Sequence, residues 1–129
     1  MQLLALAEWY TSIPISEYCI TVLMYIQGKR HVHTLLYRVP RAKVVAVCST
    51  DASEIEWAMS NQEYKDFGIT VYDNYDNMLA HPGLQAVWIS SSTDVHASQS
   101  LAAINKDLHV LCEKPLSTDL TEVCYCCHF

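Results

Sequence analysis

Apolar and polar positions fall into alternating blocks in the second half of the chain. An apolar run at residues 84–89 leads into a loop that opens with three serines, and a second run at residues 108–112 ends at a charged pair and a proline. The segment between them carries apolar residues at helical spacing, namely Ala97, Leu101 and Ile104. The pattern predicts a βαβ unit with a right-handed crossover. Open α/β sheets bind ligands beyond the carboxyl ends of their strands, so both polar loops lie where a ligand would bind.

The first half of the chain repeats the alternation. Apolar runs at residues 18–26, 43–49 and 69–72 predict three further strands. Five strands with helices between them define an α/β fold, a Rossmann-like doubly wound parallel sheet in a single domain. We expect the spatial order 3-2-1-4-5, which places Ser90 to Ser92 and Lys114 along one edge of the sheet.

Breakers and capping residues predict where helices begin and end. Pro40 ends the helix that follows the first strand. Asp51, with Glu54 three residues later, predicts the start of a second helix. Ser117 or Thr118 is expected to cap a last helix. The apolar face expected for the second helix is Ile55, Ala58 and Met59.

Composition narrows the class of protein. A chain of 129 residues, 51% hydrophobic and 17% charged, is long enough for one domain with a real core. A net charge of -6 without a Lys/Arg cluster argues against nucleic acid as a partner. The apolar run at 18–26 is about half as long as a membrane-spanning helix, and residues 1–7 lack the basic start of a secretory signal. We expect a cytoplasmic protein with no membrane partner, and oligomerisation stays open.

Six cysteines raise the question of a disulfide or metal site. Cys19, Cys48 and Cys112 stand singly in strand-like runs, where a free thiol acts as a small hydrophobe. The Cys-Tyr-Cys-Cys-His segment at 124–128 is denser, but no second pair stands at zinc-site spacing elsewhere. We therefore expect no metal site and an irregular tail over residues 123–129.

Four segments together resemble a known family in their order and spacing. They are Gly-Lys-Arg-His at 28–31, Val-Val-Ala-Val-Cys-Ser at 44–49, Ser-Ser-Ser-Thr-Asp-Val-His at 90–96 and Glu-Lys-Pro at 113–115. The chain is similar to the amino-terminal, nucleotide-binding half of a Gfo/Idh/MocA-type NAD(P)-dependent oxidoreductase of the inositol dehydrogenase kind. The resemblance implies a dinucleotide-binding domain at residues 28–122, after an atypical segment at 1–27 that includes the first strand. We expect the substrate domain of complete relatives to be absent.

The resemblance also implies the site residues. Lys114 is the implied catalytic residue, because the lysine of this motif reaches the nicotinamide and the hydroxyl carbon of the substrate in the family, where a cation stabilises alkoxide charge. The implied cofactor-binding residues are Gly28, Ser49, Asp51, Ser90, Ser91, Ser92, His96 and Glu113. An acidic residue at Asp51, with no Lys or Arg through Ser53, favours NAD over NADP, although NADP stays open.

Each assignment has a plainer alternative. Asp51 can simply cap its helix, and the serines after the fourth strand can serve loop and cap chemistry alone. A Glu-Lys-Pro tripeptide can be a surface ion pair beside a turn proline. A lone histidine at the place of His96 is more often a capping or surface residue.

The glycine turn departs from the family pattern. If Gly28 is the last glycine of G-x-G-x-x-G, Leu23 and Tyr25 stand at the first two glycine positions. Left-handed backbone costs a non-glycine residue ~1–2 kcal/mol, and a side chain there intrudes on the phosphate groove. With a lost charge-assisted hydrogen bond the penalty reaches ~3–6 kcal/mol. We expect weak binding of NAD.

Two hypotheses of different classes follow. The first is the nucleotide-binding domain of an oxidoreductase that acts on a sugar- or polyol-like CH–OH group. This domain is impaired alone, because in complete relatives a second domain supplies the substrate pocket and the general base. The second is a non-catalytic folded module that binds a nucleotide weakly or pairs with another protein.

Overall fold

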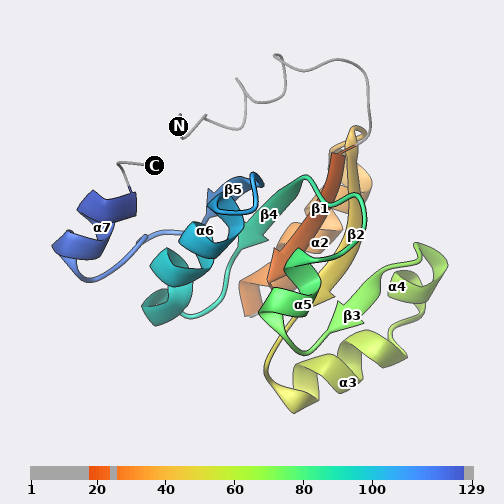
Figure 1. Ribbon diagram of the computed structural model, residues 1–129. Helices are drawn as coiled ribbons and strands as arrows, with labels where there is room; N and C mark the ends of the chain where they lie inside the picture. The colour runs from red at the N-terminus through yellow and green to blue at the C-terminus, as the bar shows by residue number, and fades with distance from the viewer. Residues whose placement is uncertain (1–17, 24–25, 127–129) are drawn as a thin grey trace.

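The computed structural model describes residues 18–23 and 26–126 (Figure 1). One sheet of five parallel strands runs through them in the order β3-β2-β1-β4-β5. The strands are β1 (Tyr18–Leu23), β2 (Ala42–Cys48), β3 (Thr70–Tyr72), β4 (Ala86–Ile89) and β5 (His109–Cys112). The expected order and the doubly wound class are confirmed.

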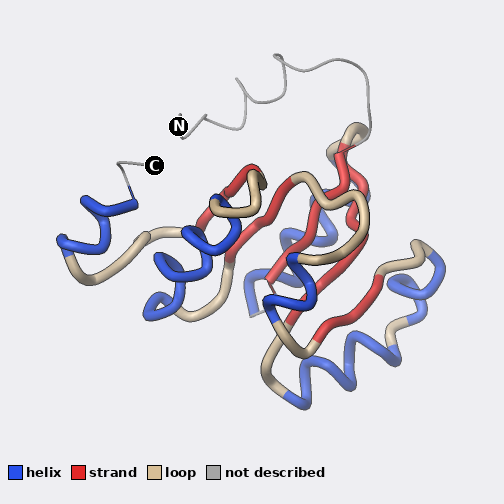
Figure 2. Tube along the Cα trace, in the orientation of Figure 1, coloured by secondary structure: helices blue, strands red, loops and turns tan. Residues whose placement is uncertain are grey.

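Helices cover both faces of this sheet. They are α2 (Ile26–Arg38), α3 (Ala52–Ser60), α4 (Gln62–Asp66), α5 (Tyr75–Leu79), α6 (His96–Ile104) and α7 (Leu120–Cys126), with a 3₁₀ turn η1 (Thr93–Val95). In Figure 1, α2 lies behind the sheet and α5 and α6 lie in front of it, and Figure 2 shows the same layers by type of element. None of the described helices is long and apolar enough to cross a bilayer.

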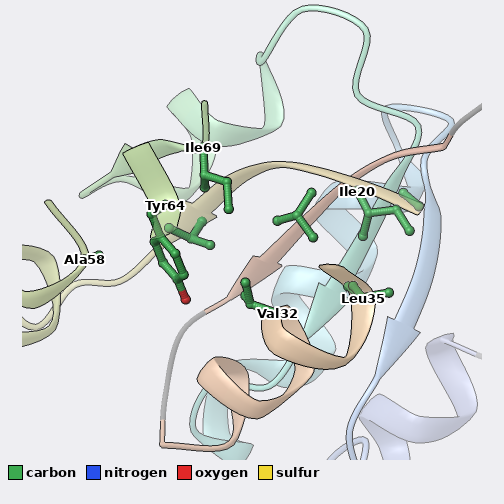
Figure 3. Close-up of a cluster of buried hydrophobic side chains, with 9 residues drawn as sticks. Ile20, Val32, Leu35, Ala58, Tyr64 and Ile69 are labelled. Atoms are coloured by element: carbon green, nitrogen blue, oxygen red, sulfur yellow. The ribbon is translucent and has the colours of Figure 1, made fainter. Parts of the chain in front are cut away.

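Two buried clusters fill the layers between sheet and helices. The first joins α2, α3 and α4 to one face of the sheet, with Ile20, Val32, Leu35, Ala58, Tyr64 and Ile69 among its members (Figure 3). The second joins α5 and α6 to the other face, around Met78, Ile89 and Ala103. Apolar side chains therefore stabilise both sides of the strands, as a parallel sheet requires.

A β-bulge interrupts the alternation along β2. Ile20 pairs with Val44 and Thr21 pairs with Ala46, so Val45 is an extra residue without a partner on β1. Val45 and Ala46 consequently pack into the same cluster although they are neighbours in sequence. The buried hydroxyl of Thr21 donates to the carbonyl of Ala46 at 2.9 Å, which satisfies a backbone acceptor beside the bulge.

The start of the sheet differs from the expectation at residues 18–26. β1 ends at Leu23 and α2 already begins at Ile26, so Gly28 lies inside the helix. An apolar run has the same pattern in a buried strand and at the start of a buried helix, so periodicity alone could not separate them.

After β2 the structure confirms one predicted helix start and differs from the sequence-based expectations at two places. Asp51 caps α3 as predicted, since its side chain accepts hydrogen bonds from the backbone N–H groups of Ser53 and Glu54. Ala58 is buried as expected, but Met59 is 59% exposed and does not belong to the packed face. The short helix α4 was not predicted, and Asn61 caps it by accepting from the N–H of Tyr64.

The carboxyl-terminal helix corrects two expectations. α7 runs through Cys126, so residues 123–126 are helical rather than irregular, and Cys126 is buried with its thiol 4.0 Å from the carbonyl of Ala97. Asp119 accepts from the N–H of Thr121 and stands where Ser117 or Thr118 was expected, while Ser117 accepts from the N–H of Asp119. Packing against α6 therefore extends the helix into the cysteine-rich segment, whose last residues 127–129 lie outside the described part.

Candidate functional site

The predicted site residues converge on the edge of the sheet where the parallel strands end. Ile89 pairs with Cys112, so the loops after β4 and β5 start side by side. The N–H of Glu113 donates to the carbonyl of Ile89 at 2.8 Å, which extends this pairing by one residue. The expectation that the serine loop and Lys114 share an edge is confirmed.

His96, the first residue of α6, joins these two loops. The side chain is only 2% exposed, with Nδ1 2.8 Å from the carbonyl of Pro115 and Nε2 3.0 Å from the carbonyl of Ser91. Both partners are acceptors, so a neutral ring donates to one of them and a doubly protonated ring to both. His96 is thus an internal residue that holds the backbone of both loops, rather than the surface or capping residue of the plainer alternative.

The three serines after β4 occupy different environments. Ser90 is 3% exposed, and the hydroxyl of Ser91 donates to Oε1 of Gln99 in α6 at 2.5 Å. Ser92 is exposed at the edge, and its carbonyl accepts from the N–H of Val95 in η1. Only Ser92 of the three presents itself openly to solvent, while Ser90 and Ser91 pack within the loop.

Glu113 makes a contact that the sequence reasoning missed. Its Oε1 lies 2.9 Å from Nε2 of His31 in α2, an ion pair when the ring is protonated, although the N–H direction falls outside hydrogen-bond geometry. The imidazole of His31 stacks on Trp88 of β4, with ring centroids 4.2 Å apart and planes 21° apart. His31 stands three residues after Gly28 and next to Val32, and both of these residues are buried. This spacing places His31 on the face of α2 that packs toward the sheet, and it is the signal in the sequence that could have indicated the contact.

Lys114 follows directly and has an exposed side chain. The peptide bond between Lys114 and Pro115 is cis. The flanking contacts at Glu113 and at the carbonyl of Pro115 hold the backbone on both sides of this lysine. The amine therefore projects from a backbone that is anchored at both ends.

The end of β2 places Ser49 and Asp51 in a local hydrogen-bond network. Ser49 is 7% exposed, and its hydroxyl donates to Oε2 of Glu54 at 2.6 Å and accepts from the N–H of Asp51 at 3.1 Å. Oδ1 of Asp51 accepts from the N–H groups of Ser53 and Glu54 at 2.8 and 3.0 Å and from the hydroxyl of Ser53. These bonds, the hydroxyl of Ser53 foremost, hold the pKa of the Asp51 carboxyl below its ordinary value. Asp51 therefore does cap its helix, and its exposed side chain still faces the edge.

Gly28 is buried in the first turn of α2. This position suits a glycine that allows close packing between the helix and the sheet. Leu23 is the last residue of β1, and Tyr25 lies outside the described residues.

The cysteines of the described residues are not arranged for metal or nucleophilic chemistry. No group of three or more His, Cys, Asp or Glu side chains gathers within residues 18–23 and 26–126. Burial raises the pKa of the Cys48 thiol to about 12 and that of Cys112 to about 11. A thiol that stays protonated is a poor metal ligand and nucleophile.

Similarity to known proteins agrees with this geometry. The profile of the Gfo/Idh/MocA family, described as an oxidoreductase family with an NAD-binding Rossmann fold, matches residues 23–127. The chain belongs to this family, and the matched part is its NAD-binding Rossmann domain.

Individual relatives match over part of their length. An uncharacterized oxidoreductase, YrbE, of Bacillus subtilis is 37% identical over 97 residues, which are 74% of this chain and 26% of that protein. Inositol 2-dehydrogenase of Salmonella typhimurium is 33% identical over 92 residues, covering 70% of this chain and 26% of that protein. The chain spans about a quarter of the length of these relatives.

Solved structures give the same picture. Scyllo-inositol dehydrogenase from Lactobacillus casei, with bound NAD(H) and scyllo-inositol, superimposes with a TM-score of 0.75 at 26% identity over 86% of this chain and 32% of that one. Myo-inositol 2-dehydrogenase from Lactobacillus plantarum superimposes with a TM-score of 0.77 at 30% identity, over 88% of this chain and 32% of that one.

Proposed function

We propose that this chain is the dinucleotide-binding part of an oxidoreductase that acts on a CH–OH group of a polyol or sugar. The observation that carries the proposal is the assembly of the serine loop, Glu113 and Lys114 at one edge, held together by His96. β1 lies between β2 and β4, so the order in which successive strands are added to the sheet reverses there, and such switch points bind dinucleotides in doubly wound sheets.

The residues at this edge fit a nicotinamide dinucleotide at three of its parts. Asp51 beyond β2 suits the ribose of the adenosine, the buried Gly28 allows a close approach of α2, and Ser92 suits the nicotinamide half. The pyrophosphate turn fits less well, because Leu23 and Tyr25 replace two glycines. We therefore propose binding that is weak, in the millimolar range.

Lys114 has the chemistry for the reacting end of the site. Bound nicotinamide would supply hydride transfer. The ammonium of Lys114 would donate a hydrogen bond to the hydroxyl oxygen of the substrate and stabilise negative charge that develops there. The contacts of Glu113 and Pro115 would fix the position from which the lysine reaches.

A titration of the ¹⁵N-labelled chain with NAD⁺ tests the proposal. We expect shifted resonances for Gly28, Asp51 and Ser92 at millimolar ligand. Replacing Leu23 and Tyr25 together by glycine should tighten binding by about a hundredfold or more, if the penalty of ~3–6 kcal/mol applies. Gln85→Gly, at the opposite edge, is the control for added flexibility. Shifts confined to the opposite edge, or none at all, would contradict the proposed site.

The alternative function is a non-catalytic module that contacts another protein. The observation in its favour is the exposure of two large apolar side chains of α7, Leu120 at 81% and Tyr125 at 58%. Exposed apolar surface is a feature of many protein contact sites. No dinucleotide binding by the Leu23→Gly/Tyr25→Gly variant would favour this alternative.

A further inference from the structure

A cation from α2 lies against α3, the helix that follows β2, whereas the residues after β2 through Ser53 include no Lys or Arg. Nζ of Lys29 lies 4.0 Å from the centroid of the Trp57 ring in α3. A cation over an indole face is held by the ring quadrupole, so the ammonium has a preferred place at this edge. Lys29 also contributes to lowering the pKa of Asp51, after the hydrogen bonds from Ser53 and Glu54, so its charge is felt at the loop after β2.

This place matters for the adenosine end of a dinucleotide. In doubly wound sheets an acidic residue after the second strand binds the ribose hydroxyls, and a nearby cation accommodates a phosphate on the 2′ oxygen. Asp51 alone would repel such a phosphate. Here Oδ1 of Asp51 already accepts from the N–H groups of Ser53 and Glu54, and the positive charge of Lys29 acts on the same carboxylate.

The aromatic partner of Lys29 is itself well fixed. Trp57 packs edge to face on Tyr64, with centroids 5.5 Å apart and planes 82° apart, and Tyr64 is 2% exposed in the core. Trp57 remains 38% exposed. A fixed indole with an open surface is a suitable platform for presenting the ammonium to a ligand.

We propose that Lys29 is a specificity-determining residue that directs this edge toward an adenine dinucleotide with a 2′-phosphate, the NADP class, rather than NAD. The inference rests on the proposed dinucleotide function and deepens it. Lys29 donates a charge-assisted hydrogen bond to the phosphate, and Trp57 keeps the amine at the edge when the ligand is absent.

Nuclear magnetic resonance titration of the ¹⁵N-labelled chain with NADP⁺, NAD⁺, 2′-AMP and 5′-AMP tests the assignment, because the method measures millimolar affinities. The indole N–H resonance of Trp57, assigned by its loss in Trp57→Phe, reports on ligand binding beside the Trp57 ring. We expect NADP⁺ to bind about tenfold more tightly than NAD⁺, and 2′-AMP more tightly than 5′-AMP by the same factor.

Variants at Lys29 separate a ligand role from a structural one. Lys29→Met keeps an unbranched side chain over the indole and should reduce both affinity ratios, NADP⁺ over NAD⁺ and 2′-AMP over 5′-AMP, to about one. Lys29→Arg keeps the charge and should keep both ratios. Lys106→Met removes an exposed cation at the opposite edge and should leave the ratios unchanged. Lys29→Gln repeats the test if the methionine variant does not give a folded spectrum.

The outcomes separate the proposed role of Lys29 from the proposed dinucleotide site. Equal binding of NAD⁺ and NADP⁺ by the unmodified chain, or equal weakening of both by Lys29→Met, would overturn the role of Lys29 and leave the dinucleotide site in place. The absence of shifts with all four ligands would overturn the dinucleotide site itself.

Discussion

His31 of α2 and Glu113, which follows β5, meet at 2.9 Å across the carboxyl edge of the sheet. Trp88 lies beneath the imidazole, so the histidine is held between an aromatic face and a carboxylate. The first and last βα turns are thereby connected directly.

Replacing His31 by alanine should expose one face of the Trp88 indole. With Trp9 and Trp57 changed to phenylalanine, Trp88 is the remaining fluorophore, and its emission should shift to longer wavelength. We expect a loss of about 0.5–1.5 kcal/mol in the free energy of unfolding, the usual contribution of a stacked aromatic pair. His33→Ala is the control, because His33 is exposed on the same helix and packs on Tyr37. Identical spectra for the two variants would contradict the contact.

His96→Ala should destabilise the domain by removing the buried imidazole that contacts the backbone of two loops. Leaving the carbonyls of Ser91 and Pro115 without their partner costs about 1–3 kcal/mol in the free energy of unfolding. Urea unfolding measures the loss, and Ser98→Ala, a neighbouring exposed position, should change the midpoint little. Hydrogen exchange should speed up in residues 90–95 and 113–117 together, and faster exchange in one loop only would speak against the coupling.

Asp51 should make stability depend on pH in the acid range. Its folded-state pKa is lowered, so the folded chain binds fewer protons than the unfolded chain between the folded value and the unfolded value of about 3.9. The stabilisation is present above about pH 3.9 and is lost as pH falls through the folded pKa. Asp51→Asn keeps a good cap without this titration, so the advantage of the native chain should be constant above about pH 3.9 and shrink as the pH falls below it. A constant difference in urea midpoint, or the same change in Asp94→Asn, would refute the assignment.

The cysteines should differ in reactivity. The raised pKa values of Cys48 and Cys112, about 12 and about 11, keep both thiols protonated near neutral pH, whereas Cys124 is exposed. Iodoacetamide should modify Cys124 well before Cys48 or Cys112, since the thiolate is the reacting form. Peptide mass spectrometry over a time course gives the order, and denaturant should abolish it. Early modification of Cys48 in the native chain would contradict its burial.

The 129-residue chain should not oxidise any polyol or sugar by itself. Holding the substrate carbon against the nicotinamide accounts for ~7–11 kcal/mol of barrier lowering, and Lys114 alone supplies neither that position nor a base. Nicotinamide absorbance with saturating cofactor and a panel of inositols and hexoses measures turnover. Substrate-dependent reduction that disappears in Lys114→Ala would show that this domain is catalytic alone.

Local signals predicted the fold well because they depend on neighbours in sequence. Asp51 capped its helix as expected, and the alternation of strands and helices gave the sheet order. Asn61 and α4 were missed, since a helix of five residues is too short to show a period. The boundary between β1 and α2 was misplaced because both are apolar there.

The site was predictable in outline and not in its contacts. That Ser92 and Lys114 share an edge follows from parallel strands alone. The meeting of Lys29 with Trp57 and of His31 with Glu113 depends on how helices pack across the sheet, which no spacing in the sequence reveals. The sequence alone therefore assigned no role to Lys29.

The extra residue Val45 also interrupts the alternation of the strand that leads into the site. Val44 and Val47 face one cluster, whereas Val45, Ala46 and Cys48 face the other. Deleting Val45 would restore strict alternation, while Ala46, Val47 and Cys48 would keep their faces and their partners on β1. The inserted residue therefore lengthens β2 without turning the chain over before Ser49, so a chain without it would reach the same edge with the same side chains facing each cluster.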